Sequence, residues 1–285
     1  MKTLHEQSSK LAVTSRAFYT EPFSTFLEKL SKVSGFESIL TMNTGAEAVE
    51  TAIKAARRWG YFSKGIPEDK AEIIVANGNF HGRTTNIVSF SSDASYKDGF
   101  GPFTPGFNSA EYCGSCDCQS IDSCLSIESF EKKINKNTCA ILVEPIQGEA
   151  GIRVPTDGWL KQLRALCTSR NILLILDEIQ SGLGRTGKLF AYEHENIKPD
   201  GLILGKALGG AILPISAFLS SKEIMNHFNP GSHGSTFGGN PLASKIAIKA
   251  IDLLFEEKLI ENSKKMGGYF LTSLRQINSK IIKEV

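Results

Sequence analysis

Lys206 and Asp177 are the residues whose type and position point most directly to chemistry. Lys206 follows the apolar run Leu202–Leu204 and precedes small residues, a setting in which burial would disfavour the ammonium form of its side chain. A lysine held neutral is a nucleophile for Schiff-base chemistry. The alternative is a lysine at a strand end that extends its amine into water, and position alone leaves both interpretations open.

Asp177 closes the most apolar run of the chain, Ile172–Leu176. A carboxylate at that depth needs a cationic or hydrogen-bonding partner, and a pyridinium nitrogen is one such partner. The interval from Asp177 to Lys206 is long enough for one crossover to a neighbouring strand of the same sheet. The two side chains are therefore expected to lie close together.

A third candidate is the small-residue turn Asn43–Ala48 at the start of a predicted helix. Free backbone N–H groups at a helix N-terminus bind anions, and Gly45 allows an oxyanion to approach the backbone closely. Taken alone, an ordinary capped helix start is the commoner interpretation. Together with a buried lysine and a buried aspartate, however, the turn completes the three fixed points that a pyridoxal phosphate site needs.

The glycine-rich stretch Gly182–Lys188 matches the glycine spacing of two nucleotide-binding motifs, the P-loop and the dinucleotide-binding fingerprint. A P-loop requires Ser or Thr after its lysine, but position 189 is Leu. A dinucleotide fingerprint requires a helix that opens directly from the glycines, and only a short segment separates Gly187 from Pro199. We therefore expect a mobile turn with a basic tip, and a nucleotide-binding enzyme is a distant alternative.

The elements that must position these residues alternate along the chain. Continuous apolar runs predict five strands covered on both faces: Ile73–Ala76, Ala140–Val143, Ile172–Leu176, Leu202–Leu204 and Ile215–Leu219. Amphipathic spacing predicts helices between them: Ala46–Tyr61 with Thr44 as its cap, Gly158–Ser169 and Pro241–Lys258. This alternation favours an α/β domain around a largely parallel sheet, in which ligands bind at the carboxyl ends of the strands.

Composition excludes several classes of protein. In 285 residues, 32 lysines and arginines against 30 aspartates and glutamates leave a net charge of +2, which argues against a nucleic-acid binder. No apolar stretch is long enough to span a bilayer, and the first ten residues lack the apolar region of a secretory signal. We expect a soluble intracellular protein without a membrane partner, and the sequence does not decide between cytoplasm and mitochondrion.

Eight segments in order resemble the class III (fold-type I) pyridoxal phosphate aminotransferases. They are Ser15–Tyr19, Met42–Glu47, Gly78–Arg83, Glu144–Gly151, Asp177–Gln180, Gly182–Lys188, Leu204–Leu208 and His233–Pro241. The resemblance implies a three-layer αβα large domain with a mostly parallel sheet over residues 1–257, incomplete at its N-terminus. Residues 258–285 would begin a small C-terminal α/β domain.

The resemblance also assigns roles around the cofactor, pyridoxal 5′-phosphate. Lys206 would form the Schiff base and shuttle the proton, and Asp177 would pair with the pyridinium. Gly45 and Ala46 would supply backbone donors to the phosphate. The remaining cofactor contacts would come from Phe80, which stacks on the ring, and from Gln180, which hydrogen-bonds the phenolic oxygen.

Three further residues are assigned by the same resemblance. Arg83 would bind a substrate carboxylate, for which the planar guanidinium is suited. Glu149 would be an acidic switch that pairs with a distant arginine and lets one site accept a dicarboxylate and a diamino acid in turn. Thr236 would reach a phosphate in the neighbouring subunit, which implies a homodimer with shared active sites.

Within this family the segments are most similar to enzymes that act on ornithine. The expected reaction moves the δ-amino group of L-ornithine to 2-oxoglutarate, giving glutamate 5-semialdehyde and glutamate. Acetylornithine and 4-aminobutyrate are alternative donors, and a non-catalytic homologue is an alternative of another class. Because the family extends beyond this chain at both ends, we expect a truncated product that keeps the cofactor residues and turns over poorly alone.

Four cysteines within twelve residues form an apparent insertion, Glu111–Cys124. Their positions are Cys113, Cys116, Cys118 and Cys124. The preferred interpretation is a solvent-exposed variable loop with reduced thiols. The alternative is a zinc or redox loop that would act as a sensor, with Cys113 and Cys116 as the expected pair, although the spacing is compressed for a metal knuckle.

Overall fold

The computed structural model describes residues 1–15, 17–114, 121 and 124–282, and they build one seven-stranded sheet. The strands are β1 (Ser38–Met42), β2 (Glu72–Ala76), β3 (Phe107–Ala110), β4 (Thr138–Val143), β5 (Leu173–Asp177), β6 (Gly201–Leu204) and β7 (Ser216–Ser220). Their order is β1-β7-β6-β5-β4-β2-β3. The neighbours from β3 to β6 pair in parallel, and β7 is antiparallel to both β6 and β1.

All five predicted strands are present, with ends that differ by one or two residues. The two edge strands β1 and β3 were missed. Both carry polar residues among the apolar ones and neither is fully buried, so they lack the continuous apolar run that revealed the central strands.

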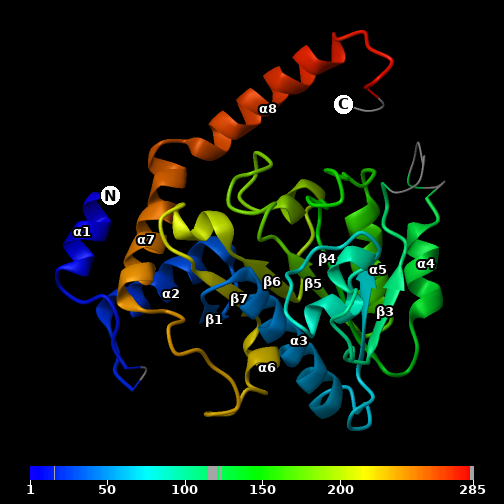
Figure 1. Ribbon diagram of the computed structural model, residues 1–285, viewed down its shortest axis with the longest axis horizontal. Coiled ribbons are helices and arrows are strands. Elements are labelled where there is room, and N and C mark those ends of the chain that lie inside the picture. The colour runs from blue at the N-terminus through cyan, green and yellow to red at the C-terminus, as the bar shows by residue number, and fades with distance from the viewer. Residues whose placement is uncertain (16, 115–120, 122–123, 283–285) are drawn as a thin grey trace.

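Helices cover both faces of the sheet (Figure 1). The α-helices are α1 (Lys2–Ser8), α2 (Glu21–Ser34), α3 (Gly45–Phe62), α4 (Ser126–Lys133), α5 (Trp159–Ser169), α6 (Lys222–Met225), α7 (Pro241–Glu256) and α8 (Leu259–Arg275). Short 3₁₀ turns are η1 (Ile87–Phe90), η2 (Ala94–Tyr96), η4 (Ala191–Glu195) and η5 (Lys206–Gly209).

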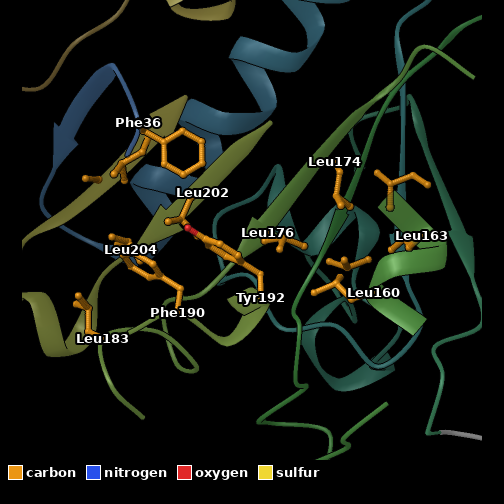
Figure 2. Packing of buried hydrophobic residues seen from close by; sticks show 14 of the residues in the cluster. Phe36, Leu160, Leu163, Leu174, Leu176, Leu183, Phe190, Tyr192, Leu202 and Leu204 are labelled. Atoms are coloured by element: carbon orange, nitrogen blue, oxygen red, sulfur yellow. The ribbon is translucent and has the colours of Figure 1, made fainter. Parts of the chain in front are cut away.

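Alternate residues of each central strand enter two separate cores. In β5, Leu174 and Leu176 pack with residues of α2, α4, α5 and α7, whereas Leu173 and Ile175 face α3. Figure 2 shows the first core around Leu174, Leu176 and the stacked rings of Phe190 and Tyr192. The predicted three-layer αβα architecture is confirmed.

The helix α3 begins where the sequence predicts it. The Thr44 side chain accepts the backbone N–H of Glu47, and the Glu47 carboxylate accepts the backbone N–H of Thr44, which makes a complete capping box. At the other end of the helix, Gly60 lies so close to β4 that an added Cβ would be 2.8 Å from the Cβ of Cys139. Glycine at this position sets the distance between α3 and the sheet.

The predicted helix Pro241–Lys258 ends at Glu256, and α8 follows after Lys258, whose backbone has φ of 51°. Figure 1 shows α8 extending away from the sheet, and none of its residues is buried. Its first turns pack on the glycine-rich stretch, where Ile260 and Lys264 lie over Gly184 and Gly187. That stretch forms turns rather than a helix start, as predicted, and Arg185 is its exposed basic tip.

Among the described residues, no helix is both long enough and apolar enough to cross a membrane.

Two glycine-to-alanine substitutions are expected to change stability in opposite directions. Gly60→Ala forces the Cβ contact with Cys139, so the clash outweighs the better helix propensity of alanine and lowers the free energy of unfolding by about 1–3 kcal/mol. Gly267→Ala adds a methyl group with open space around it on α8, so it raises that free energy by about 0.5–1 kcal/mol. Urea denaturation of both variants measures the difference. Equal shifts of both midpoints would contradict close packing at Gly60.

Candidate active site

The carboxyl ends of the strands meet around a cavity of about 200 Å³. It is lined by Gly45, Ala46, Phe80, His81, Gly82, Glu144, Asp177, Ile179, Gln180 and Lys206. These residues come from five connections: those after β1, β2, β4, β5 and β6. The structure therefore brings together all the predicted cofactor contacts except Thr236, at the edge of the sheet where ligands of parallel sheets bind.

Asp177 is buried at the end of β5 and is held by two donors. The Nδ1 atom of His81 lies 2.7 Å from its Oδ2 atom, and the backbone N–H of Ile179 donates to Oδ1 at 3.0 Å. Burial by itself would lower the pKa of His81, but the hydrogen bond and negative charge of Asp177, with the charge of Glu144, raise it. The Asp177 carboxylate is thus fixed at the edge of the cavity by His81 and by the backbone of Ile179, where it can pair with a ring N–H.

Sequence reasoning missed His81 because it assigned only its neighbours Phe80 and Arg83. The available signal was a histidine that follows β2 in the same segment, within reach of the buried aspartate once the strands are placed side by side.

Glu144 is the second residue that was missed. It is 5% exposed and accepts backbone N–H groups from Phe80 at 3.0 Å and Gly148 at 3.5 Å. Burial raises its pKa to about 7, and the charge of Asp177 adds to the effect while His81 opposes it. It directly follows the apolar strand β4, so the signal that pointed to Asp177 would also have identified it.

The first turn of α3 supplies the anion cradle. The side chain of Thr44 accepts the N–H of Glu47, and Gly45 and Ala46, whose N–H groups belong to the first turn of the helix, line the cavity. An added Cβ on Gly45 would lie 2.8 Å from Ile179, so a larger residue would push that side chain out of place. A phosphate fits this cradle, with the aspartate and lysine on the same cavity.

Lys206 lines the cavity but is exposed, so the expectation of a buried lysine is wrong for this chain. The strand β6 ends at Leu204, and Lys206 begins the turn η5 with φ of 40°, beyond the buried part of the strand. The lysine also borders a larger depression of about 850 Å³, which continues past Gln180 to α7 and the start of α8.

The predicted substrate residues lie at the rim of the site. Arg83 is exposed, and its guanidinium lies 4.3 Å from the ring centre of Tyr96 and 5.8 Å from that of Phe80. Glu149 is exposed and accepts the Nε2–H of Gln180 at 2.9 Å. Gln180 and Phe80 line the cavity. Glu149 contacts Gln180, and Arg83 contacts the ring of Phe80.

Thr236 lies away from this cavity. It is exposed beside a different depression, lined also by Val13, Thr14 and Ser15. The structure therefore does not bring Thr236 together with Asp177 of the same chain.

Two of the four clustered cysteines can be placed, while Cys116 and Cys118 lie outside the described residues. Cys113 and Cys124 are buried, so the expected solvent exposure is wrong for these two. Burial raises the pKa of the Cys124 thiol, and a hydrogen bond with Cys113 raises it further. Cys113 also contacts Thr156 Oγ1 at 3.1 Å. The part of the chain that is described contains no group of three or more metal-ligating side chains.

A mostly parallel sheet that carries a lysine, a buried aspartate and a helix N-terminus around one cavity defines a pyridoxal-phosphate-dependent transferase of fold type I. The model of the aminotransferase class-III family matches residues 1–285, and the chain belongs to this family. Its members use pyridoxal phosphate, which fits the donors found here.

Individual relatives are similar over the whole chain. Ornithine aminotransferase of Brevibacillus brevis is 53% identical over 285 residues, which are 68% of its length. The crystal structure of ornithine aminotransferase from Toxoplasma gondii superposes with a TM-score of 0.92 and 42% identity, over 99% of this chain and 65% of that one. The crystal structure of acetylornithine aminotransferase from Elizabethkingia anophelis superposes with a TM-score of 0.82 and 49% identity, over 96% of this chain and 65% of that one. The chain thus spans about two thirds of the length of these relatives.

The raised pKa of Glu144 predicts a specific pH dependence of stability. The pKa of Glu144 is raised from 4.5 to about 7 on folding. The contribution of its protonated carboxyl to the free energy of unfolding is therefore fully present below pH 4.5 and is lost as the pH rises through about 7. The difference in free energy of unfolding between the wild type and Glu144→Gln should therefore fall by up to about 3 kcal/mol over this interval. Urea denaturation at a series of pH values measures it. Glu68→Gln, at an exposed site, is the control, and parallel curves for wild type and Glu144→Gln would contradict the assignment.

Proposed function

We propose that this protein transfers the δ-amino group of L-ornithine to 2-oxoglutarate, giving glutamate 5-semialdehyde and glutamate. The observation that carries the proposal is the Asp177–His81 pair, which faces Lys206 and the start of α3 across one cavity. The substrate is inferred from the names of the relatives that are about half identical over the whole chain.

When bound, pyridoxal phosphate supplies an electron sink for charge that develops at a substrate carbon. The N–H groups of Gly45 and Ala46 hold the phosphate at the positive end of α3. Asp177, held in place by His81, would accept the N–H of the pyridinium ring. Phe80 lines the cavity and would stack on the cofactor ring.

The proton transfer belongs to Lys206. Its Nζ atom borders the cavity beyond β6, where it can take a proton from the substrate carbon and return it at the neighbouring position. Gln180 lines the cavity and would donate an amide N–H to the phenolic oxygen of the cofactor. Arg83 and Glu149 at the rim bind the charged ends of the substrate.

The organisation beyond the site is part of the same proposal. Residues 1–257 form the cofactor-binding domain, and α8 begins a second domain in residues 258–285, because it leaves the body of the molecule with no buried residue. Thr236, exposed and remote from Asp177, serves the phosphate of a neighbouring subunit in a homodimer with shared active sites.

A second candidate donor is acetylornithine, since the similarity to an acetylornithine aminotransferase reaches 49% identity. Adding ornithine, acetylornithine or 4-aminobutyrate separately to the holoenzyme and following the cofactor absorbance distinguishes the donors. Ornithine is expected to convert the cofactor fastest. Faster conversion by either of the other amines would reassign the substrate.

Two substitutions test the catalytic assignment. Lys206→Ala should lower turnover by at least about a thousandfold because it removes the proton-transferring amine. Asp177→Asn should lower it by about a hundredfold or more because an amide cannot stabilise the ring cation. Stopped-flow half-reactions with ornithine measure both.

Borohydride trapping, followed by peptide mapping, identifies the amine that holds the cofactor. The label is expected on Lys206 in the wild type and in Lys70→Ala, an exposed control. A label on another lysine, or a Lys206→Ala variant with normal turnover, would exclude the proposed role.

A further inference from the structure

The segment that joins β7 to α7, residues 221–240, runs back along α3 from its end to its beginning. His227 lies 2.8 Å from Ser63 Oγ and stacks on Phe62 at the C-terminal end of the helix. His233 contacts the middle of the helix through Thr51 and Lys54. Thr236 thus lies in a segment that is attached to α3. The first turn of the same helix is the proposed phosphate cradle.

The partners of His233 determine its protonation state. Thr51 Oγ1 already donates its proton to the carbonyl oxygen of Glu47 at 2.8 Å, so it accepts from His233 Nε2, which is 2.8 Å away. The Lys54 ammonium can only donate, and it lies 2.8 Å from Nδ1. Both contacts are satisfied at once by the neutral imidazole with its hydrogen on Nε2.

The surroundings of the ring favour the same neutral form. Burial lowers the pKa of His233, and the positive charge of Lys54 lowers it further. Lys54 is the charged group that faces the ring from α3, while the uncharged ring of Phe228, 5.3 Å away, stacks on it from within the segment. A proton added at Nδ1 would point at the ammonium group and break the contact.

A second attachment lies at Ser235, directly before Thr236. Ser235 Oγ accepts the side-chain N–H of Asn43 and the backbone N–H of Gly238, both at 3.0 Å. Asn43 directly precedes Thr44, the cap of α3. Thr236 is therefore exposed in a short stretch of backbone, with His233 anchored before it and Ser235 beside it.

We propose that His233 is a positioning residue, which as the neutral Nε2–H tautomer fastens residues 233–237 to α3 and so presents Thr236 to the phosphate bound by a second copy of the chain. This rests on the proposed function for the identity of the phosphate. The two hydrogen bonds of His233, with Thr51 and with Lys54, are called the clasp below. The pKa of His233 is lowered on folding from its ordinary value of 6.5. The clasp therefore stabilises the folded chain fully above pH 6.5, and this stabilisation is lost as the pH falls below that value. Acid therefore releases Thr236 from its attachment to α3.

The clasp can be tested without cofactor. Long-range ¹H–¹⁵N spectra of the histidine-labelled chain at pH 7.5 should show His233 as the Nε2–H tautomer. Amide hydrogen exchange of residues 233–237 should be about tenfold faster in His233→Ala, which loses the two hydrogen bonds. His233→Gln keeps a donor and an acceptor, so it should retain protection and lose the acid-dependent release. His194→Gln is the control for removal of a histidine elsewhere.

Lys54→Met provides a matched prediction of opposite sign. Without the ammonium group, the pKa of His233 rises, so the onset of release in Lys54→Met should move to higher pH. A cationic ring or an Nδ1–H tautomer at pH 7.5, or wild-type exchange in His233→Ala, would overturn the clasp.

Retention of the cofactor tests the role of the clasp in the holoenzyme. After dialysis at pH 7.5, His233→Ala should keep several-fold less pyridoxal phosphate than the wild type, as should Thr236→Val, while His233→Gln keeps the normal amount. Equal retention in His233→Ala and wild type would overturn the positioning role. If the wild type itself binds no pyridoxal phosphate, the proposed function fails, and the exchange experiment alone decides whether the clasp exists.

Discussion

The structure depends on the Asp177 carboxylate, which is buried at the carboxyl end of the central strand β5. Asp177 is 4% exposed at the end of a wholly buried strand, and such a charge is strongly destabilising unless a cation and hydrogen-bond donors accompany it. His81 and the backbone of Ile179 meet that need. The loop after β2 is therefore fixed against the end of β5, and this loop also carries Phe80 and Gly82 to the cavity. The carboxylate that would pair with a pyridinium ring is thus held in position by the fold itself.

Two buried carboxylates near the cavity are given different properties by their surroundings. Asp177 has a histidine within hydrogen-bonding distance. Glu144 receives only backbone N–H groups directly, and burial raises its pKa to about 7. An enzyme that creates and moves charge at one carbon benefits from two carboxylates with different surroundings, because Glu144 can exchange a proton near neutral pH.

The helix α3 connects the parts of the molecule that serve a phosphate. Its first turn supplies the cradle, its capping box fixes where that turn begins, and its flank holds the segment with Thr236. One helix therefore sets the position of both proposed phosphate contacts. Gly60, packed on β4, keeps the helix at a short distance from the sheet.

The sequence by itself determined the three layers, the five buried strands, the start of α3 and the aspartate and lysine at adjacent strand ends, because these follow from local apolar runs, capping residues and the rule that parallel strands end at one edge. Tertiary structure decided the rest. The partnership of His81 with Asp177 joins residues 96 positions apart, and the raised pKa of Glu144 depends on what covers it. The exposure of Lys206, the burial of Cys113 and Cys124, and the contact of His233 with α3 likewise depend on packing between distant segments, which no local pattern encodes.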